Sequence, residues 1–221
     1  MHFPSTIWTQ IKSAGSGDRK ALEDLFRKYQ PAVVTFARSE GASAQDADDI
    51  AQEVFQAICD VKFLRKVDPA KGKFRSLVLA VTRNLILMQK RENAAQKRGG
   101  NTKLVSVDEL HGQGFDVEDL KDERFDNFWV QTLVARGMEL LKRECAEKGT
   151  PFYKAMVLFV SGEPYTDVAE KLGVSASQVK SYIHQARAKL KRFVGGLIKE
   201  YSASNEEYRK ELKYLLKFLR D

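Results

Sequence analysis

Polar side chains suited to reading nucleic-acid bases occur at helical spacing between residues 177 and 187. Hydroxyl, amide, imidazole and ammonium groups form hydrogen bonds with base edges in the major groove of duplex DNA. The side chains of this kind are Ser177, Gln178, Lys180, Ser181, His184 and Gln185. The cations after them are suited to phosphate, and they are Arg187, Lys189, Lys191 and Arg192. The alternative is the solvated face of an ordinary helical hairpin, so the surrounding elements must decide.

The sequence around these residues predicts a helix-turn-helix. Apolar spacing indicates a short helix from Tyr165 to Leu172 and a longer one that begins after Ser175. Between them, Gly173 can take the left-handed conformation that ends a helix, and Ser175 can cap the next helix. Residues 176–200 contain six basic side chains and one acidic side chain. Shape and charge together favour DNA binding, with the second helix in the major groove.

A second set of candidate DNA contacts lies around Gly72 and along a predicted helix from about Phe74 to Gln96. Cations, aromatic rings and amides are the groups with which proteins hold unstacked bases and their backbone. The candidates are Lys71, Lys73, Phe74, Arg75, Arg83, Asn84 and Arg91. Spacing alone does not separate this interpretation from a core helix with a basic outer face.

An acidic face is predicted on a helix from about Gln45 to Val61. Asp48, Asp49, Gln52 and Glu53 lie opposite its apolar stripe. These carboxylates would repel phosphate and suit a basic or polar protein surface. The alternative is that these acids only complement the helix dipole near the N-terminus of the helix. That alternative explains the aspartates well and Glu53 less well. A hydrolase that uses the cluster is a further class, but no histidine or third ligand accompanies it.

The charge of the chain is divided into blocks. The 221 residues carry a net charge of +7, which favours an anionic partner. Residues 61–100 hold eleven basic and two acidic side chains, whereas residues 101–130 hold three basic and eight acidic ones. A surface that only had to be solvated would not need this segregation.

The sequence predicts a cytoplasmic protein with no membrane contact, no metal and no cofactor. No apolar run approaches the roughly 18–20 residues of a membrane span. The first residues also lack the pattern of a signal peptide. Cys59 and Cys145 are far apart, and two such cysteines form neither a disulfide framework nor a zinc site.

The expected fold is all-α, because no segment shows convincing strand alternation with turn chemistry. We expect an N-terminal helical domain over residues 1–98, in which Pro31 interrupts a helix. An acidic linker follows over 99–125, then a helix-turn-helix domain over 126–200. Residues 201–221 predict an amphipathic helical extension. Packing of this extension on the second domain is the favoured interpretation, and a regulatory or partner-binding helix is the alternative.

Three motifs, in this order, resemble the extracytoplasmic-function (ECF) class of bacterial sigma factors. The first is the acidic run over 46–55, and the second is Gly72–Ser76 with Arg83 and Asn84. The third is the helix-turn-helix over 165–187. The resemblance covers roughly residues 15–198, with the linker unmatched, and three motifs in order are more specific than any one alone.

The resemblance implies a non-enzymatic protein that binds core RNA polymerase and directs it to promoter DNA. It implies that Asp48, Asp49, Gln52 and Glu53 dock on the clamp helices of the polymerase. Lys71–Arg75, Arg83 and Asn84 would open the start-proximal element. The more distant element would be read by Lys180, Ser181, His184 and Gln185, with Arg187 near phosphate. An anti-sigma factor or other regulator is a candidate further partner. A stand-alone helix-turn-helix regulator of duplex DNA is the alternative, although it would have no need of the acidic face.

Overall fold

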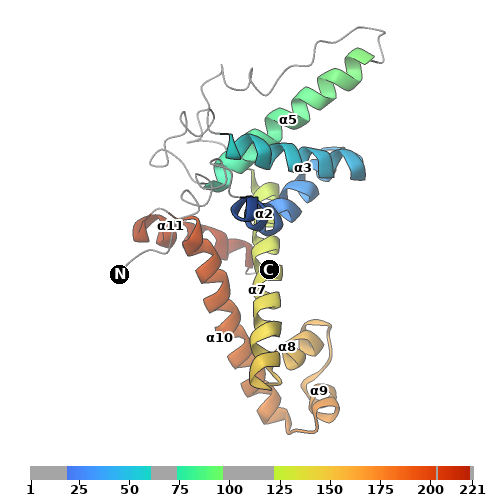
Figure 1. The fold of residues 1–221 in the computed structure, drawn as a ribbon. Coiled ribbons are helices and arrows are strands. Elements are labelled where there is room, and N and C mark those ends of the chain that lie inside the picture. Colours follow the sequence, from blue (N-terminus) through green and yellow to red (C-terminus); the bar gives the residue numbers. More distant parts are fainter. Residues whose placement is uncertain (1–18, 61–73, 97–121, 203, 220–221) are drawn as a thin grey trace. The chain divides into compact units, whose positions relative to one another are not determined.

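The computed structural model describes residues 19–60, 74–96, 122–202 and 204–219. Every regular element in these ranges is helical, which confirms the all-α prediction (Figure 1). The elements are α2 (Arg19–Ser39), α3 (Ala44–Cys59), α5 (Phe74–Gln96), α7 (Glu123–Lys148), α8 (Phe152–Val160), α9 (Tyr165–Leu172), α10 (Ala176–Glu200), α11 (Asn205–Leu215) and the 3₁₀ turn η1 (Leu216–Leu219).

The chain divides into two compact units. The first comprises Met1–Thr132 and Glu200–Asp221, and the second comprises Leu133–Lys199. The first turns of α7 therefore belong with the N-terminal helices, whereas the sequence placed residues from 126 onward in the second domain. The extension after residue 200 also belongs to the first unit, although packing on the second domain was favoured. Nearly all of the expected linker, 99–121, lies outside the described residues.

The first unit is built on α2, α3 and α5, which pack against one another (Figure 1). Ser43 caps α3, since its hydroxyl oxygen accepts a hydrogen bond from the Asp46 N–H at 3.1 Å. Pro31 lies inside α2, where the sequence predicted an interruption. Proline costs about 3 kcal/mol in a helix interior. Burial offsets this cost, because Tyr29 is 2% exposed and Ala32 and Val33 are fully buried.

Aromatic rings from four separated parts of the chain form the centre of the first unit. Tyr29 stacks on Trp129 with 4.9 Å between ring centroids, and Phe74 meets Tyr29 edge-on at 5.4 Å. Tyr201 lies edge-on to Trp129 at 5.8 Å. Each such pair contributes about 0.5–1.5 kcal/mol beyond its area burial. The cluster therefore joins α2, the start of α5, the first turns of α7 and the residue that follows α10.

The second unit contains the helix-turn-helix. Gly173 ends α9 with φ +65°, and the Val174 N–H donates to the Ala169 carbonyl at 3.0 Å. Ser175 and Gln178 then form a reciprocal cap of α10. The Gln178 N–H donates to the Ser175 hydroxyl at 3.2 Å, and the Ser175 N–H donates to the Gln178 side chain at 2.8 Å. The turn and cap predicted from Gly173 and Ser175 are thus confirmed.

Two helices of the second unit approach each other closely at Gly137. A Cβ atom added to Gly137 of α7 would lie 2.8 Å from Leu190 Cδ1 and 2.9 Å from Val194 Cγ2 of α10. No side chain larger than hydrogen fits without movement of these two residues. The unit's core is otherwise apolar, and it includes Leu141, Ala155, Met156, Val168, Ala169, Val179, Ile183 and Ala186.

Candidate functional site

One face of α10 carries all seven residues that the sequence assigned to DNA in the second unit. The opposite face is buried through Val179, Ile183 and Ala186, at four- and three-residue spacing. This burial fixes which side of α10 meets solvent. The seven exposed residues are Ser177, Gln178, Lys180, Ser181, His184, Gln185 and Arg187. The candidate DNA-contacting residues of this set therefore share one accessible face of α10.

Aromatic rings of α8 and α9 hold two of these cations. Lys180 Nζ lies 5.6 Å from the ring centroid of Tyr165, and the Arg187 guanidinium carbon lies 5.5 Å from that of Phe159. At exposed sites such contacts contribute about 0.5–1 kcal/mol. They restrict the two long side chains before any ligand arrives, which lowers the entropy cost of a later contact. Sequence reasoning missed these roles of Phe159 and Tyr165, because aromatics beside a helix-turn-helix usually indicate only core.

Within the second unit, the Glu144 carboxylate of α7 accepts hydrogen bonds from three cations. Lys189 and Arg192 of α10 donate hydrogen bonds to Glu144, as does Lys148 of α7. The hydrogen bonds from Lys189 and then Lys148 lower the pKa of Glu144 to about 2. The sequence predicted that Lys189 and Arg192 contact phosphate. In the structure both are already paired with Glu144 within the second unit. Nothing in the local sequence around Glu144 indicated this role.

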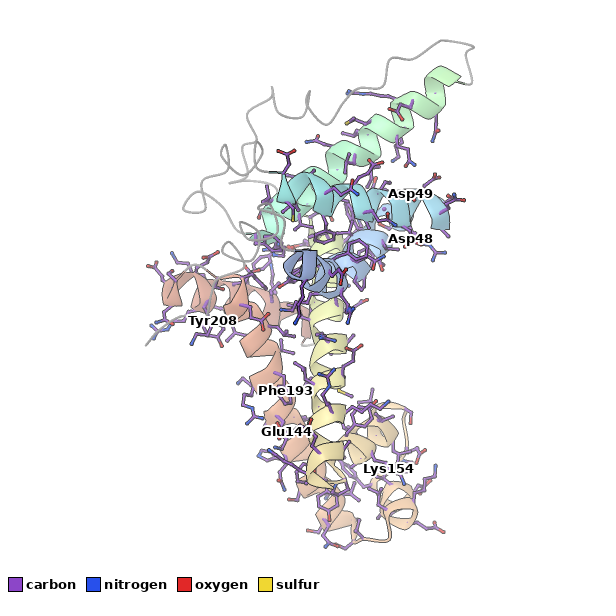
Figure 2. All side chains as sticks on the ribbon, viewed as in Figure 1. Asp48, Asp49, Glu144, Lys154, Phe193 and Tyr208 are labelled. Carbon is purple, nitrogen blue, oxygen red and sulfur yellow. The ribbon has the colours of Figure 1, made fainter. Side chains whose placement is uncertain are left out.

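The four residues assigned to polymerase docking lie exposed along α3, opposite its buried stripe. Figure 2 shows Asp48 and Asp49 on this helix. No ion pair joins Asp48, Asp49 or Glu53 to a cation among the described parts of the chain. Partial loss of hydration beside neighbouring groups raises the pKa of Glu53, with smaller contributions from the negative charges of Glu92 and Asp49. Glu92 of α5 therefore adds to this negative surface, a neighbour that the sequence did not identify.

The start-proximal set is dispersed rather than gathered. Lys71 and Lys73 lie outside the described residues. Arg91 is exposed, Asn84 is half-buried, and Arg83 donates to Asp122 at 2.7 Å.

Phe74 and Arg75 differ from the expectation that they face DNA. Phe74 is fully buried because its ring completes the aromatic cluster of the first unit. Arg75 is 3% exposed, and its guanidinium pairs with Asp126 and, at 2.9 Å, with Glu211. Neither side chain can reach a base or phosphate in this conformation. Their tertiary partners lie on α7 and α11, so a pattern read along α5 alone could not reveal them.

No other chemistry is evident in the described parts of the chain. They contain no cluster of three or more histidine, cysteine, aspartate or glutamate side chains placed to hold a metal ion. Cys59 and Cys145 are buried free thiols, and burial raises the pKa of Cys59 to about 11. None of the helices in these ranges combines the length and apolar character that crossing a bilayer requires.

Comparison with known proteins gives one result that bears on these surfaces. The family model described as ECF sigma factor matches residues 4–195. The match spans α2 to α9 and most of α10, and it ends before α11 begins. No curated protein matched the chain.

Proposed function

The chain belongs to the ECF sigma factor family, and from this premise we propose which of its surfaces perform each step of transcription initiation. A sigma factor binds core RNA polymerase and directs it to promoter DNA. The chain therefore needs one surface for a protein and at least one for DNA. The described residues offer an acidic face on α3 and a polar, basic face on α10.

We assign polymerase docking to Asp48, Asp49, Gln52 and Glu53 of α3. These side chains are exposed on a helix whose other face is packed, so the backbone beneath them is held by the core. A rigid acidic face of this kind complements a basic or polar helical surface. It is unsuited to phosphate, so docking on protein is the better use of it.

We assign reading of the more distant promoter element to the exposed face of α10. The single observation that carries this assignment is the placement of seven polar or basic side chains opposite the buried stripe of a capped recognition helix. Lys180, Ser181, His184 and Gln185 are assigned to base edges and Arg187 to phosphate. Helices of this type enter the major groove with their N-terminal residues on the bases.

We assign contact with the start-proximal element to α5 and to Lys71 and Lys73, which precede it in the sequence and lie outside the described residues. Among the described members of this set, Arg83, Asn84 and Arg91 reach solvent. Arg75 and Phe74 join them only after a rearrangement that opens the interior of the first unit.

Co-purification of the chain with core RNA polymerase, followed by sequencing of the transcripts that depend on it, tests this proposal. We expect a stable complex and a defined set of start sites. A control chain with Lys180→Ala and His184→Ala should still bind core polymerase but lose those start sites. A chain that binds duplex DNA without associating with core polymerase would instead be a stand-alone regulator, and the proposal would fail.

A further inference from the structure

The segment beyond the family match lies against the start of α5. The match ends at residue 195, whereas α11 begins at Asn205. Within the first unit, Glu211 of α11 is 1% exposed and accepts a hydrogen bond from Arg75 Nε at 2.9 Å. The Arg75 guanidinium carbon also lies 5.0 Å from the ring centroid of Tyr214. A helix that the family pattern does not include therefore covers an arginine that the family pattern does include.

Further hydrogen bonds tie this covering segment to the first turns of α7. The Trp129 indole N–H donates to the Tyr201 hydroxyl at 3.3 Å, and that hydroxyl donates to Glu211 at 3.3 Å. The Tyr214 hydroxyl donates to Asp126, whose other oxygen accepts from Arg75. Arg75 is thus contacted by side chains of both α7 and α11.

The charges of this network are compatible with the release of α11 from Arg75. The one guanidinium of Arg75 contacts two carboxylates, those of Asp126 and Glu211. Removal of one member of a buried pair is costly when it strands a charge. Withdrawal of α11 would leave Arg75 and Asp126 paired one to one, while Glu211 moved into water. The uncovered surface would therefore remain balanced.

The covering helix also depends on its docking. α11 has 11 residues, and isolated helices shorter than about 12–15 residues are marginal in water. Most of its side chains are exposed or half-buried, and Glu211 and Leu215 are its buried residues. Much of what holds α11 in place is therefore the contact with Arg75, Asp126 and the aromatic cluster.

We propose that α11 is an intramolecular cover that keeps Arg75 from DNA until the cover is displaced. The inference rests on the proposed use of α5 in start-proximal contact. If only the open molecules bind DNA through Arg75, the apparent affinity equals the affinity of the open form multiplied by the fraction of molecules that are open. Opening uncovers Arg75, which then exchanges its remaining partner Asp126 for a DNA phosphate, and it carries the Glu211 carboxylate away from this site.

Single-stranded DNA binding by the full-length chain tests the cover. The probe is a fluorescent single-stranded DNA of mixed sequence, titrated by anisotropy over a range of salt. Glu211→Gln is compared with Glu206→Gln, which removes the same charge from an exposed site of α11 that pairs with Lys210. Glu211→Gln should tighten binding and steepen the salt dependence by about 0.7 for one added phosphate contact. Glu206→Gln should change the slope little.

A double-mutant cycle with Arg75→Gln tests whether Arg75 is the cation that steepens the salt dependence of Glu211→Gln. The steeper slope of Glu211→Gln should disappear when Arg75 is also replaced. Hydrogen exchange over residues 205–215 reports whether the cover has been released, and thermal melting reports whether the chain is folded. If Glu211→Gln impairs folding, Tyr214→Phe serves instead, because it removes the bond to Asp126 and keeps the ring. It should change binding in the same direction.

Two outcomes of the binding experiment would overturn the cover. One is faster exchange in α11 with unchanged DNA affinity and salt slope. The other is a steeper slope that persists without Arg75. Failure of the proposed function looks different, because neither the natural chain nor Glu211→Gln would then support promoter-dependent transcription with core polymerase. Equal transcription by both chains, with α11 released in Glu211→Gln, would refute the cover alone.

Discussion

Arg192 of α10 donates a hydrogen bond to Glu144 of α7, with 2.6 Å between Nη2 and Oε2. Lys189 of α10 donates to the other carboxylate oxygen (Figure 2 labels Glu144). The middle of α10 is therefore anchored by charge to α7, while the N-terminal part exposes to solvent the residues proposed to read bases. Within the second unit this divides α10 into a segment paired with α7 and a segment that we propose reads DNA.

Glu144→Gln should release Lys189 and Arg192 for phosphate. Affinity for duplex DNA of unrelated sequence should rise, and the salt dependence should steepen by up to about 1.8, or about 0.9 for each new phosphate contact. Discrimination between the promoter and unrelated DNA should fall, because the added contacts do not read bases. Glu139→Gln is the control, since Glu139 is an exposed acid of α7 that pairs with Arg136. An unchanged salt slope in Glu144→Gln would contradict the prediction.

The same carboxylate should give the second unit an acid-sensitive contribution to its stability. The pKa of Glu144 is lowered from 4.5 to about 2 in the folded chain. A depressed pKa stabilises the folded state above the unfolded value and loses that effect as the pH falls through the folded value. The stability difference between the natural chain and Glu144→Gln should therefore shrink as the pH falls from about 4.5 towards 2. Denaturant titrations at several pH values measure it, and a difference that is independent of pH would count against the assignment.

Asp48→Arg combined with Asp49→Arg should weaken docking on core polymerase. The substitution places cations where acids are expected to meet a basic or polar surface, and like-charge contacts of this kind cost several kcal/mol. We expect at least about a tenfold loss of affinity for core polymerase. Duplex DNA binding by the isolated full-length chain should not weaken.

The matched control for the docking variant is Glu139→Arg combined with Glu147→Arg. It changes the net charge equally on exposed positions of α7. Pull-down titrations with core polymerase compare the two variants. Comparable losses of affinity in both variants would show that net charge causes the effect. That result would contradict docking through α3.

Substitutions on the reading face of α10 should separate base readers from phosphate binders. Lys180→Ala and His184→Ala should each change the preference at particular base pairs by about 1–3 kcal/mol. Arg187→Ala should weaken binding to all sequences and make the salt slope shallower by about 1. Binding to a library of promoter variants distinguishes these effects, and a uniform loss in all three variants would refute the separate roles.

Gly137→Ala should destabilise the second unit. The added methyl would lie under 3.0 Å from Leu190 and Val194, and overpacking of this kind costs about 1–3 kcal/mol. Gly196→Ala is the matched control, because nothing lies within 4 Å of its added Cβ and it also sits inside a helix. That control should stabilise the chain by up to about 1 kcal/mol through helix propensity. Thermal melting of both variants checks the prediction, which fails if their melting temperatures shift alike.

The sequence by itself determined the all-α fold, the helix-turn-helix and which faces of α3 and α10 meet solvent. These features depend on residues within about two turns of one another. The spacing of Val179, Ile183 and Ala186 sets one face of α10, and Gly173 and Ser175 set its start. Such local preferences for helix period, turn and cap act almost independently of the rest of the chain.

Only the tertiary structure decided that Arg75 is buried and paired with carboxylates. Its partner Glu211 lies 136 residues away in the sequence, and no periodicity along α5 points to it. The same holds for Glu144 beneath α10 and for Pro31, which stays helical because its neighbours are buried. In each case a long-range contact overrides or completes a local preference. A pattern indicates which chemical groups a helix carries, whereas packing decides which of them remain accessible.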